Sequence, residues 1–223
     1  MDEVLTRTEG EPSAYPDNAK SRQILDGARR VFLAEGFDGA SMGSIARAAG
    51  VSKGTLYVYF KDKEALFEAL THAERGDLAE VLFNLDQADP DVRAVLHRVG
   101  TSFLDMMVRP DHVASVRMVI GAADKFPRFA QSFYEAGPAF GVARLKAYFD
   151  GQVSGGRLVI DDTSLAAEQF LNLCAAGVLK RLLFGMPESI TRETLAHNVE
   201  AAVEVFLAAY ARSSSRSAAA TRD

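Results

Sequence analysis

The chain has 223 residues, of which 48% are hydrophobic, and this suits one small and one larger globular domain or a single all-helical unit. No stretch approaches the ~18 consecutive apolar residues of a membrane-spanning helix, and the first residues lack the basic start and apolar core of a signal peptide. Cys174 is the only cysteine, so no disulfide can form within the chain. We therefore expect a cytoplasmic protein that does not bind a membrane.

The net charge of −5 is unevenly distributed along the chain. Between positions 20 and 63, eight basic residues stand against four acidic ones, whereas the segments on either side are acidic. A basic module on an acidic body is typical of a protein with one face that meets phosphate. Chance clustering could give the same count, so charge alone does not show that the protein binds nucleic acid.

The first predicted helix follows a polar segment, residues 1–19, which has no periodicity and is expected to be a disordered tail. From about residue 20, apolar residues recur at helical spacing and form one stripe: Ile24, Ala28, Val31 and Phe32. Gly36 follows where a glycine commonly ends a helix, so we expect the helix to stop there.

Two short helices, over 42–49 and 53–59, are predicted next. Ser41 and Ser52 stand where an N-cap residue is expected, and Gly50 can take the positive φ of a tight turn between the helices. Small or apolar residues occupy the positions where the two helices would touch: Ile45, Ala46, Val51 and Leu56. This spacing predicts a helix-turn-helix between Ser41 and Tyr59.

Polar and aromatic residues gather on the other face of the second short helix: Ser52, Lys53, Thr55, Tyr57 and Tyr59. Hydroxyls, an amine and aromatic edges within two turns suit the base edges and phosphates of the major groove. Each residue alone has a plainer role, since a serine caps helices and a tyrosine is more often part of a core. Their combination with the glycine turn and with Lys61 and Lys63 predicts binding to double-stranded DNA.

Helical periodicity continues through most of the remaining chain. Asp62 can cap a long helix, and further helices are expected over 90–108, 111–124, 127–136, 138–152, 163–184 and 191–211. Residues 213–223 lack periodicity and are expected to form a second disordered tail. The sequence predicts an all-α protein of about nine helices, with an N-terminal three-helix DNA-binding module and a C-terminal helical domain for ligand binding and dimerisation.

Aromatic and methionine residues are dense in the middle of the chain and are candidates for a ligand cavity: Phe103, Met106, Met107, Met118, Phe129 and Phe133, together with Phe170. Such side chains line adaptable apolar pockets, and they also fill ordinary helical cores. If they line a pocket, its ligand is a small, mostly apolar or aromatic effector.

The last two predicted helices carry small and apolar residues that would let helices approach closely: Phe170, Gly177, Val178, Leu195, Val199, Val203 and Phe206. Two such helices from each of two chains would form a four-helix bundle at a homodimer interface. Packing within one chain is the alternative.

The run from Val51 to Phe67, together with the preceding residues 24–50, resembles the signature of the TetR/AcrR family of bacterial repressors. The resemblance implies an all-helical homodimer with a three-helix DNA module and a six-helix regulatory domain. It places the base- and phosphate-contacting positions on Ser41, Ser52, Lys53, Thr55, Tyr57, Tyr59 and Lys63. Val58 departs from the commoner aromatic or polar residue, so a base contact there would be apolar, for example with a thymine methyl.

The C-terminal part resembles the AefR-like regulatory domain more weakly, through Phe126-Pro127, the segment from Phe133 to Pro138, Gly156-Arg157-Leu158 and the segment from Ala166 to Phe170. We expect a disordered tail over 1–19, a DNA-binding domain over 20–64, a regulatory domain over 65–212 and a tail over 213–223.

The expected function is that of a ligand-responsive transcriptional repressor, whose partners are operator DNA, a small effector and a second copy of itself. A DNA-binding regulator or activator without an effector is the alternative. An enzyme is disfavoured because the chain has no P-loop or Rossmann motif. The four histidines have no metal-binding spacing, so no metal or cofactor is expected. Cys174 has apolar neighbours in sequence, which favours a buried structural residue over a redox sensor.

Overall fold

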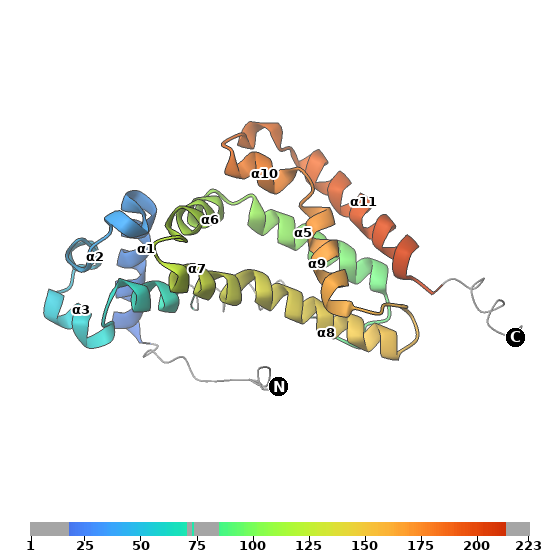
Figure 1. Cartoon of the computed structure of the whole chain (residues 1–223), viewed down its shortest axis with the longest axis horizontal. Helices are drawn as coiled ribbons and strands as arrows, with labels where there is room; N and C mark the ends of the chain where they lie inside the picture. The colour runs from blue at the N-terminus through green and yellow to red at the C-terminus, as the bar shows by residue number, and fades with distance from the viewer. Residues whose placement is uncertain (1–17, 71–72, 74–84, 213–223) are drawn as a thin grey trace, which may run out of the picture. The chain divides into compact units, whose positions relative to one another are not determined.

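The computed structural model describes residues 18–70, 73 and 85–212, and within these ranges the fold is all-α, as predicted (Figure 1). Helices fill most of the described chain, and the extended pairing found in it is one antiparallel bridge between Leu158 and Ala211. In the same ranges, no helix combines the length and the apolar character needed to cross a membrane. The predicted tails lie outside the described residues, except that Asn18 caps the first helix and Ala19 begins it.

The chain divides into two compact units, Met1–Ala73 and Glu74–Asp223. The first contains α1 (Ala19–Gly39), α2 (Met42–Ala49), α3 (Lys53–Tyr59) and a helix over 63–70. Gly36 ends the first regular helical stretch of α1 as predicted, since it has φ 70° and ψ 170° and interrupts the helical backbone. A short second stretch continues α1 to Gly39.

The core of the first unit is built on the predicted stripe of α1, whose four residues are all buried. Phe32 stacks on Phe37 at 5.5 Å between ring centroids, and Phe67 meets both rings edge-on at 5.7 and 6.0 Å. Because Phe67 lies on the helix over 63–70, this helix belongs to the first unit. The division of the chain therefore falls after Ala73, later than the predicted boundary between residues 64 and 65.

The second unit contains α5 (Val92–Met107), α6 (Pro110–Ala122), α7 (Pro127–Tyr134), α8 (Phe140–Ser154), α9 (Thr163–Cys174), α10 (Val178–Leu183) and α11 (Arg192–Tyr210). The helix predicted over 163–184 is broken into α9 and α10, because Gly177 takes φ 73° and starts a new helix direction. The two helices predicted over 127–136 and 138–152 are instead joined by a π-helical turn, Glu135–Ala139, that contains Pro138.

Aromatic side chains of α8, α9 and α11 form the centre of the second unit, where these helices pack with α5 (Figure 1). Phe206 stacks on Phe149 at 4.8 Å and meets Phe170 edge-on at 5.6 Å. Gly100 of α5 faces Cys174, and a Cβ atom there would lie 3.0 Å from the Cys174 Sγ. Burial raises the pKa of the Cys174 thiol to about 12, which favours the structural role over redox sensing.

Two side chains of α8 donate hydrogen bonds to main-chain carbonyls of the segment that precedes α5. The Tyr148 hydroxyl donates to the carbonyl of Asp89 at 3.1 Å, and the Gln152 amide donates to the carbonyl of Gln87 at 2.9 Å. Burial raises the pKa of Tyr148 to about 12, so this hydroxyl remains a donor over the physiological pH range. These bonds fix the start of α5 on the core.

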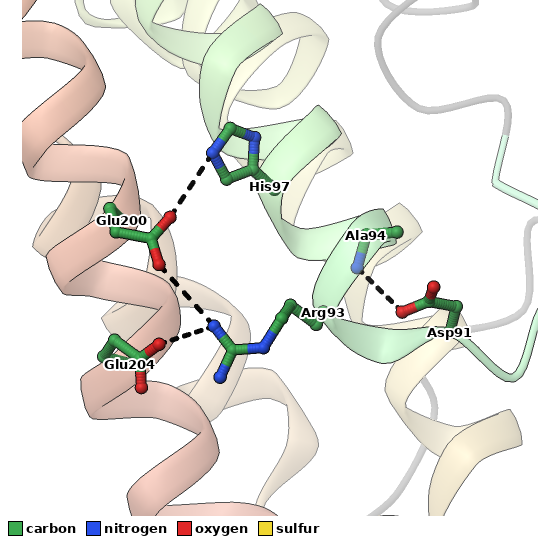
Figure 2. A network of polar contacts seen from close by, with 6 residues as sticks. All are labelled: Asp91, Arg93, Ala94, His97, Glu200 and Glu204. Atoms are coloured by element: carbon green, nitrogen blue, oxygen red, sulfur yellow. Dashed lines mark hydrogen bonds and ion pairs between the residues drawn. The ribbon is translucent and has the colours of Figure 1, made fainter.

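A polar network joins α5 to α11 on the surface of the second unit (Figure 2). The Arg93 guanidinium lies 2.6 Å from a carboxylate oxygen of Glu204 and 3.6 Å from one of Glu200. Glu200 also faces His97, with 3.5 Å between the Nε2 and carboxylate oxygen atoms. The hydrogen bond from Arg93 lowers the pKa of Glu204. All four side chains are exposed, so the network orients the two helices more than it stabilises them.

Candidate nucleic-acid interface

Two side chains of α1 hold the C-terminal end of α2. The Gln23 amide donates to the carbonyl of Ala49 at 2.7 Å, and the Arg30 guanidinium donates to the carbonyl of Ala48 at 2.6 Å. The last carbonyls of a helix have no partner within the helix, so these bonds satisfy groups that would otherwise rely on water. They hold α2 against α1 and thereby fix the position from which α3 begins.

The turn between α2 and α3 has the geometry that the sequence predicted. Ser41 caps α2 through its hydroxyl, which accepts from the Ser44 amide at 3.1 Å. Gly50 ends α2 with φ 64°, a conformation in which other residues are strained. Ile45 and Leu56 are fully buried and pin α3 to α2. The helix-turn-helix is thus formed by the predicted residues.

Ser52 and Thr55 form a paired hydroxyl surface at the start of α3. The Thr55 amide donates to the Ser52 hydroxyl at 3.0 Å, and the two side-chain oxygens lie 2.8 Å apart. Ser52 is exposed and Thr55 is half-exposed, so the pair faces solvent while it caps the helix. Each hydroxyl keeps further hydrogen-bonding capacity for an outside partner.

Lys53, Tyr57 and Tyr59 follow on α3 with different degrees of exposure. Lys53 is exposed and lies against α2, since a Cβ atom on Gly43 would be 3.3 Å from its Nζ. Tyr57 is 54% exposed and Tyr59 is half-buried beside Phe60. The structure therefore places four predicted DNA-contacting residues on α3 and a fifth, Ser52, at its N-cap, with Tyr57 as their most exposed aromatic ring.

Lys63 makes hydrogen bonds within the chain, unlike a residue that only contacts phosphate. Its ammonium donates to the main-chain carbonyls of Phe37 at 2.8 Å, Asp38 at 3.3 Å and Ala40 at 3.4 Å, and it lies 4.7 Å from the Phe37 ring centroid. An ammonium has three donors, and these carbonyls can engage all of them. The structure gives Lys63 an intramolecular role, namely holding the α1–α2 turn, and its contact with phosphate stays a prediction.

Gly54 and Val58 complete the outer face of α3; the sequence named Val58 only as a possible apolar base contact and did not name Gly54. Val58 is 82% exposed and Gly54 is exposed one turn before it. The sequence did contain a signal for them, because glycine and a β-branched residue are both unfavourable within a short helix. Their position beside Tyr57 includes them in the candidate interface.

The predicted ligand-contacting residues all belong to the second unit but differ in burial. Phe170 is part of the central aromatic core, and Met107 and Phe129 are also buried. Phe103, Met106, Met118 and Phe133 are half-buried, and the first two pack at the edge of the core. These four remain the better candidates for an effector site, while Phe170 has a core position.

Most of the predicted dimer residues are buried within the single chain. The fully covered ones are Phe170, Val178, Val199, Val203 and Phe206. Side chains that are already inaccessible have no surface left to bury against a second copy, so these five have an intramolecular role. Helical periodicity identified the apolar face of each helix correctly but did not show that neighbouring helices of the same chain cover it. Gly177 is exposed and Leu195 is half-buried.

Two family profiles match this chain. The profile of "Bacterial regulatory proteins, tetR family" matches residues 24–70, and that of the "AefR-like transcriptional repressor, C-terminal domain" matches residues 94–212, more than half of the chain. The chain belongs to the TetR family. The TetR assignment confirms both resemblances seen in the sequence and makes the protein a transcriptional repressor by class, not an enzyme.

Three similar TetR proteins each match three quarters or more of the chain. The HTH-type transcriptional repressor Rv1474c of Mycobacterium tuberculosis is 31% identical over 175 residues, which cover 75% of this chain and 84% of that protein. Among solved structures, the flavonoid-responsive regulator FrrA is 33% identical with a TM-score of 0.75, covering 86% of this chain and 97% of its own. A TetR family regulator from Pseudomonas syringae pv. tomato is 26% identical with a TM-score of 0.72, covering 89% and 100%.

Proposed function

We propose that this TetR protein is a homodimeric repressor that binds a near-palindromic operator and is released by a small, mostly apolar effector. The observation that carries the proposal is the outer face of α3, where hydroxyl, amine and aromatic groups are exposed on a helix held by α1 and α2. A helix with such a face is the element that enters the major groove in helix-turn-helix proteins.

The family and the outward faces of α9 and α11 support the proposed dimer. On α11 this face carries Ala201, Val205 and Ala208, and on α9 it carries Leu165, of which Val205 is 53% exposed and Leu165 49% exposed. Small side chains allow close approach of a second pair of helices. Two-fold symmetry would then place the two recognition helices about one DNA turn apart, or a multiple of it, which requires a near-palindromic operator.

The effector class is suggested by two features. Half-buried aromatic and methionine side chains in α5, α6 and α7 can adapt to an apolar guest. FrrA, which matches most of this chain at 33% identity, is named for its response to flavonoids. We therefore take flavonoids and similar flat aromatic molecules as the first effectors to test.

Selection from a random duplex DNA library, followed by anisotropy titration, tests operator binding. We expect a near-palindromic consensus and selective binding, with Thr55→Val weakening the operator complex by roughly 5–150-fold if Thr55 contacts a base. Val159→Ala is a matched control for a single surface substitution, since Val159 is 51% exposed in the second unit and lies outside the proposed dimer face. Binding that is equal for selected and random duplexes would contradict the proposal.

Effector control is tested by calorimetry of the flavonoid with and without saturating operator. Thermodynamic linkage requires that an effector that weakens operator binding is itself bound more weakly in the presence of operator, by the same factor of roughly 5–150. Equal affinity in both conditions for every flavonoid that binds would favour the alternative, a regulator without an effector.

A further inference from the structure

α7 and α8 are joined without a break in the helical backbone, through the π-helical turn Glu135–Ala139 (Figure 1). The residues that flank this turn have ordinary helical dihedral angles, with φ −62° and ψ −46° at Tyr134 and φ −63° and ψ −45° at Phe140. A π-helical turn within a longer helix is rare and is frequently found at a functional site. This turn is therefore a place to look for a function that the sequence did not indicate.

Gly137 and Pro138 stand next to each other inside the turn. Glycine and proline are the least favourable residues for a helix interior, and in a regular α-helix a proline ring collides with the carbonyl four residues earlier. Both residues are exposed. A Cβ atom on Gly137 would meet nothing within 4 Å, and Gly137 does not have a positive φ. Packing within the unit therefore does not explain the pair.

The helices on the two sides of the turn pack on different partners. α8 packs on α9, and its Tyr148 and Phe149 are fully buried in the central core of the second unit. α7 packs instead on α6. The weakest point of the continuous helix thus lies between a helix that is fixed in the core and a helix that is not part of that core.

The half-buried candidates for the effector site are divided between these two parts. Phe103 and Met106 of α5 pack at the edge of the central core, whereas Met118 belongs to α6 and Phe133 to α7. Phe133 lies only two residues before the turn, so a change of angle at the turn shifts Phe133 relative to Phe103 and Met106. An apolar site that encloses its ligand has to open before the ligand can enter.

We propose that the turn at Gly137 and Pro138 is a hinge that lets α7 tilt relative to α8, so that the effector can enter between α5 and the α6–α7 pair. The inference rests on the proposed function, because the hinge regulates access to the effector site of the repressor. An effector that enters through the tilted form stabilises that form. Since the effector releases the operator, thermodynamic linkage requires that the operator favours the untilted form.

Hydrogen exchange of the full-length wild-type protein, with and without saturating operator, tests the hinge. Tilting opens amide hydrogen bonds at the turn, so these amides exchange at a rate that follows the population of the tilted form. We expect the amides of residues 135–140 to exchange roughly fivefold or more slowly in the presence of operator, the lower end of the usual coupling between two sites. The amides of residues 145–150 in α8 should not respond, because both forms keep the core.

The double variant Gly137→Ala/Pro138→Ala replaces the hinge with residues that favour a regular helix. We expect a higher thermal midpoint, operator affinity at least equal to that of the wild type, and no slowing of exchange at the turn by operator. Quercetin is the flavonoid probe for release, and the variant should need a concentration roughly tenfold or more above that for the wild type. If quercetin does not release the wild type, the exchange measurement decides the inference by itself.

Gly121→Ala is the matched control, since Gly121 is an exposed glycine of α6 and an added Cβ atom there would meet nothing within 4 Å. This variant should also gain stability, because alanine is the better helix residue. It should keep the slowing of exchange by operator at residues 135–140, since the hinge is intact. The control therefore separates loss of the hinge from a general gain of helix stability.

The outcomes separate this inference from the proposed function. Selective operator binding with an unchanged exchange rate at residues 135–140 would overturn the hinge and leave the repressor intact. The same holds if the double variant still shows the slowing by operator. A wild-type protein that selects no sequence from the library would overturn the proposed function, and with it the regulatory role of the hinge.

Discussion

A Cβ atom on Gly27 would lie 2.6 Å from both the Cα and the Cβ atom of Ala49. Gly27 is buried in the middle of α1, and Ala49 is the last residue of α2, so the two helices touch through their backbones at this point. Gln23 and Arg30, which hold the carbonyls of Ala49 and Ala48, lie one turn to either side of Gly27 on α1. The helix-turn-helix is therefore held on α1 by one close backbone contact, with a hydrogen bond on either side of it.

Gly27→Ala is expected to destabilise the first unit by about 1–3 kcal/mol, because the added methyl has no room and α2 must move away. In an open helical position the same substitution would stabilise by roughly 0.5–1 kcal/mol. Gly121 of α6 is such a position, because it is exposed and an added Cβ atom would meet nothing within 4 Å. Urea unfolding of Gly27→Ala and of Gly121→Ala measures both effects. We expect opposite signs, and a stable Gly27→Ala variant with normal operator binding would contradict the close contact.

Lys63→Met tests whether Lys63 holds the α1–α2 turn or contacts phosphate. The substitution keeps the aliphatic stem but removes the donors to three carbonyls, so we expect a loss of about 1–3 kcal/mol of stability and weaker binding to all duplexes. Loss of one phosphate contact would also lower the slope of log affinity against log salt by about 0.9.

Lys61→Met is the comparison for that slope, since the Lys61 side chain is 82% exposed. We expect the slope to fall for Lys61→Met and to stay near the wild-type value for Lys63→Met. Equal changes in the two variants would show that Lys63 also neutralises a phosphate.

Val205→Asp tests the proposed dimer face, because it places a charge where α11 would meet a second copy. We expect a monomer by light scattering at micromolar concentration, and operator affinity reduced by roughly 100-fold or more because the two recognition helices are no longer linked. Val159→Asp is the control, since Val159 is similarly exposed, at 51%, but lies outside α9 and α11. A dimeric Val205→Asp would place the interface elsewhere.

Features that depend on residues a few positions apart could be predicted from the sequence. Ser41, Ser52 and Asp62 cap the helices that they were expected to cap, because a cap is made within one turn of its own helix. The same holds for the positive φ of Gly50. The exposed polar and aromatic face of α3 was predictable for the same reason, since its members lie within two turns.

Features that depend on distant residues were not predictable in this way. Periodicity across 163–184 does not show that Gly177 breaks the helix, because a glycine within an apolar repeat is compatible with either outcome. The partners of Lys63 lie more than twenty positions earlier in the chain. The covering of Val199 and Val203 depends on which helices meet α11, which the pattern of α11 alone does not contain.

The last prediction concerns the dependence of stability on pH through His112 of α6. Burial lowers the pKa of this half-buried imidazole from its ordinary value of 6.5. Two smaller effects oppose each other, since Asp111 raises this pKa and Arg109 lowers it. Just below pH 6.5, the His112 imidazole is therefore protonated in the unfolded chain but still neutral in the folded chain. The free energy of unfolding must fall as the pH drops through this range, until the folded imidazole also becomes protonated.

His112→Gln removes this titrating group, so the free energy of unfolding should depend less on pH. From pH 7.5 to pH 5.5, the stability of the variant relative to wild type is therefore expected to increase. His197→Gln serves as the control, because His197 is exposed on α11. Urea unfolding at the two pH values measures all three proteins. Other groups that titrate in this range contribute equally to wild type and variant, so they cancel in the comparison. If the wild type and His112→Gln lose the same stability on acidification, then protonation of His112 is not opposed by the fold.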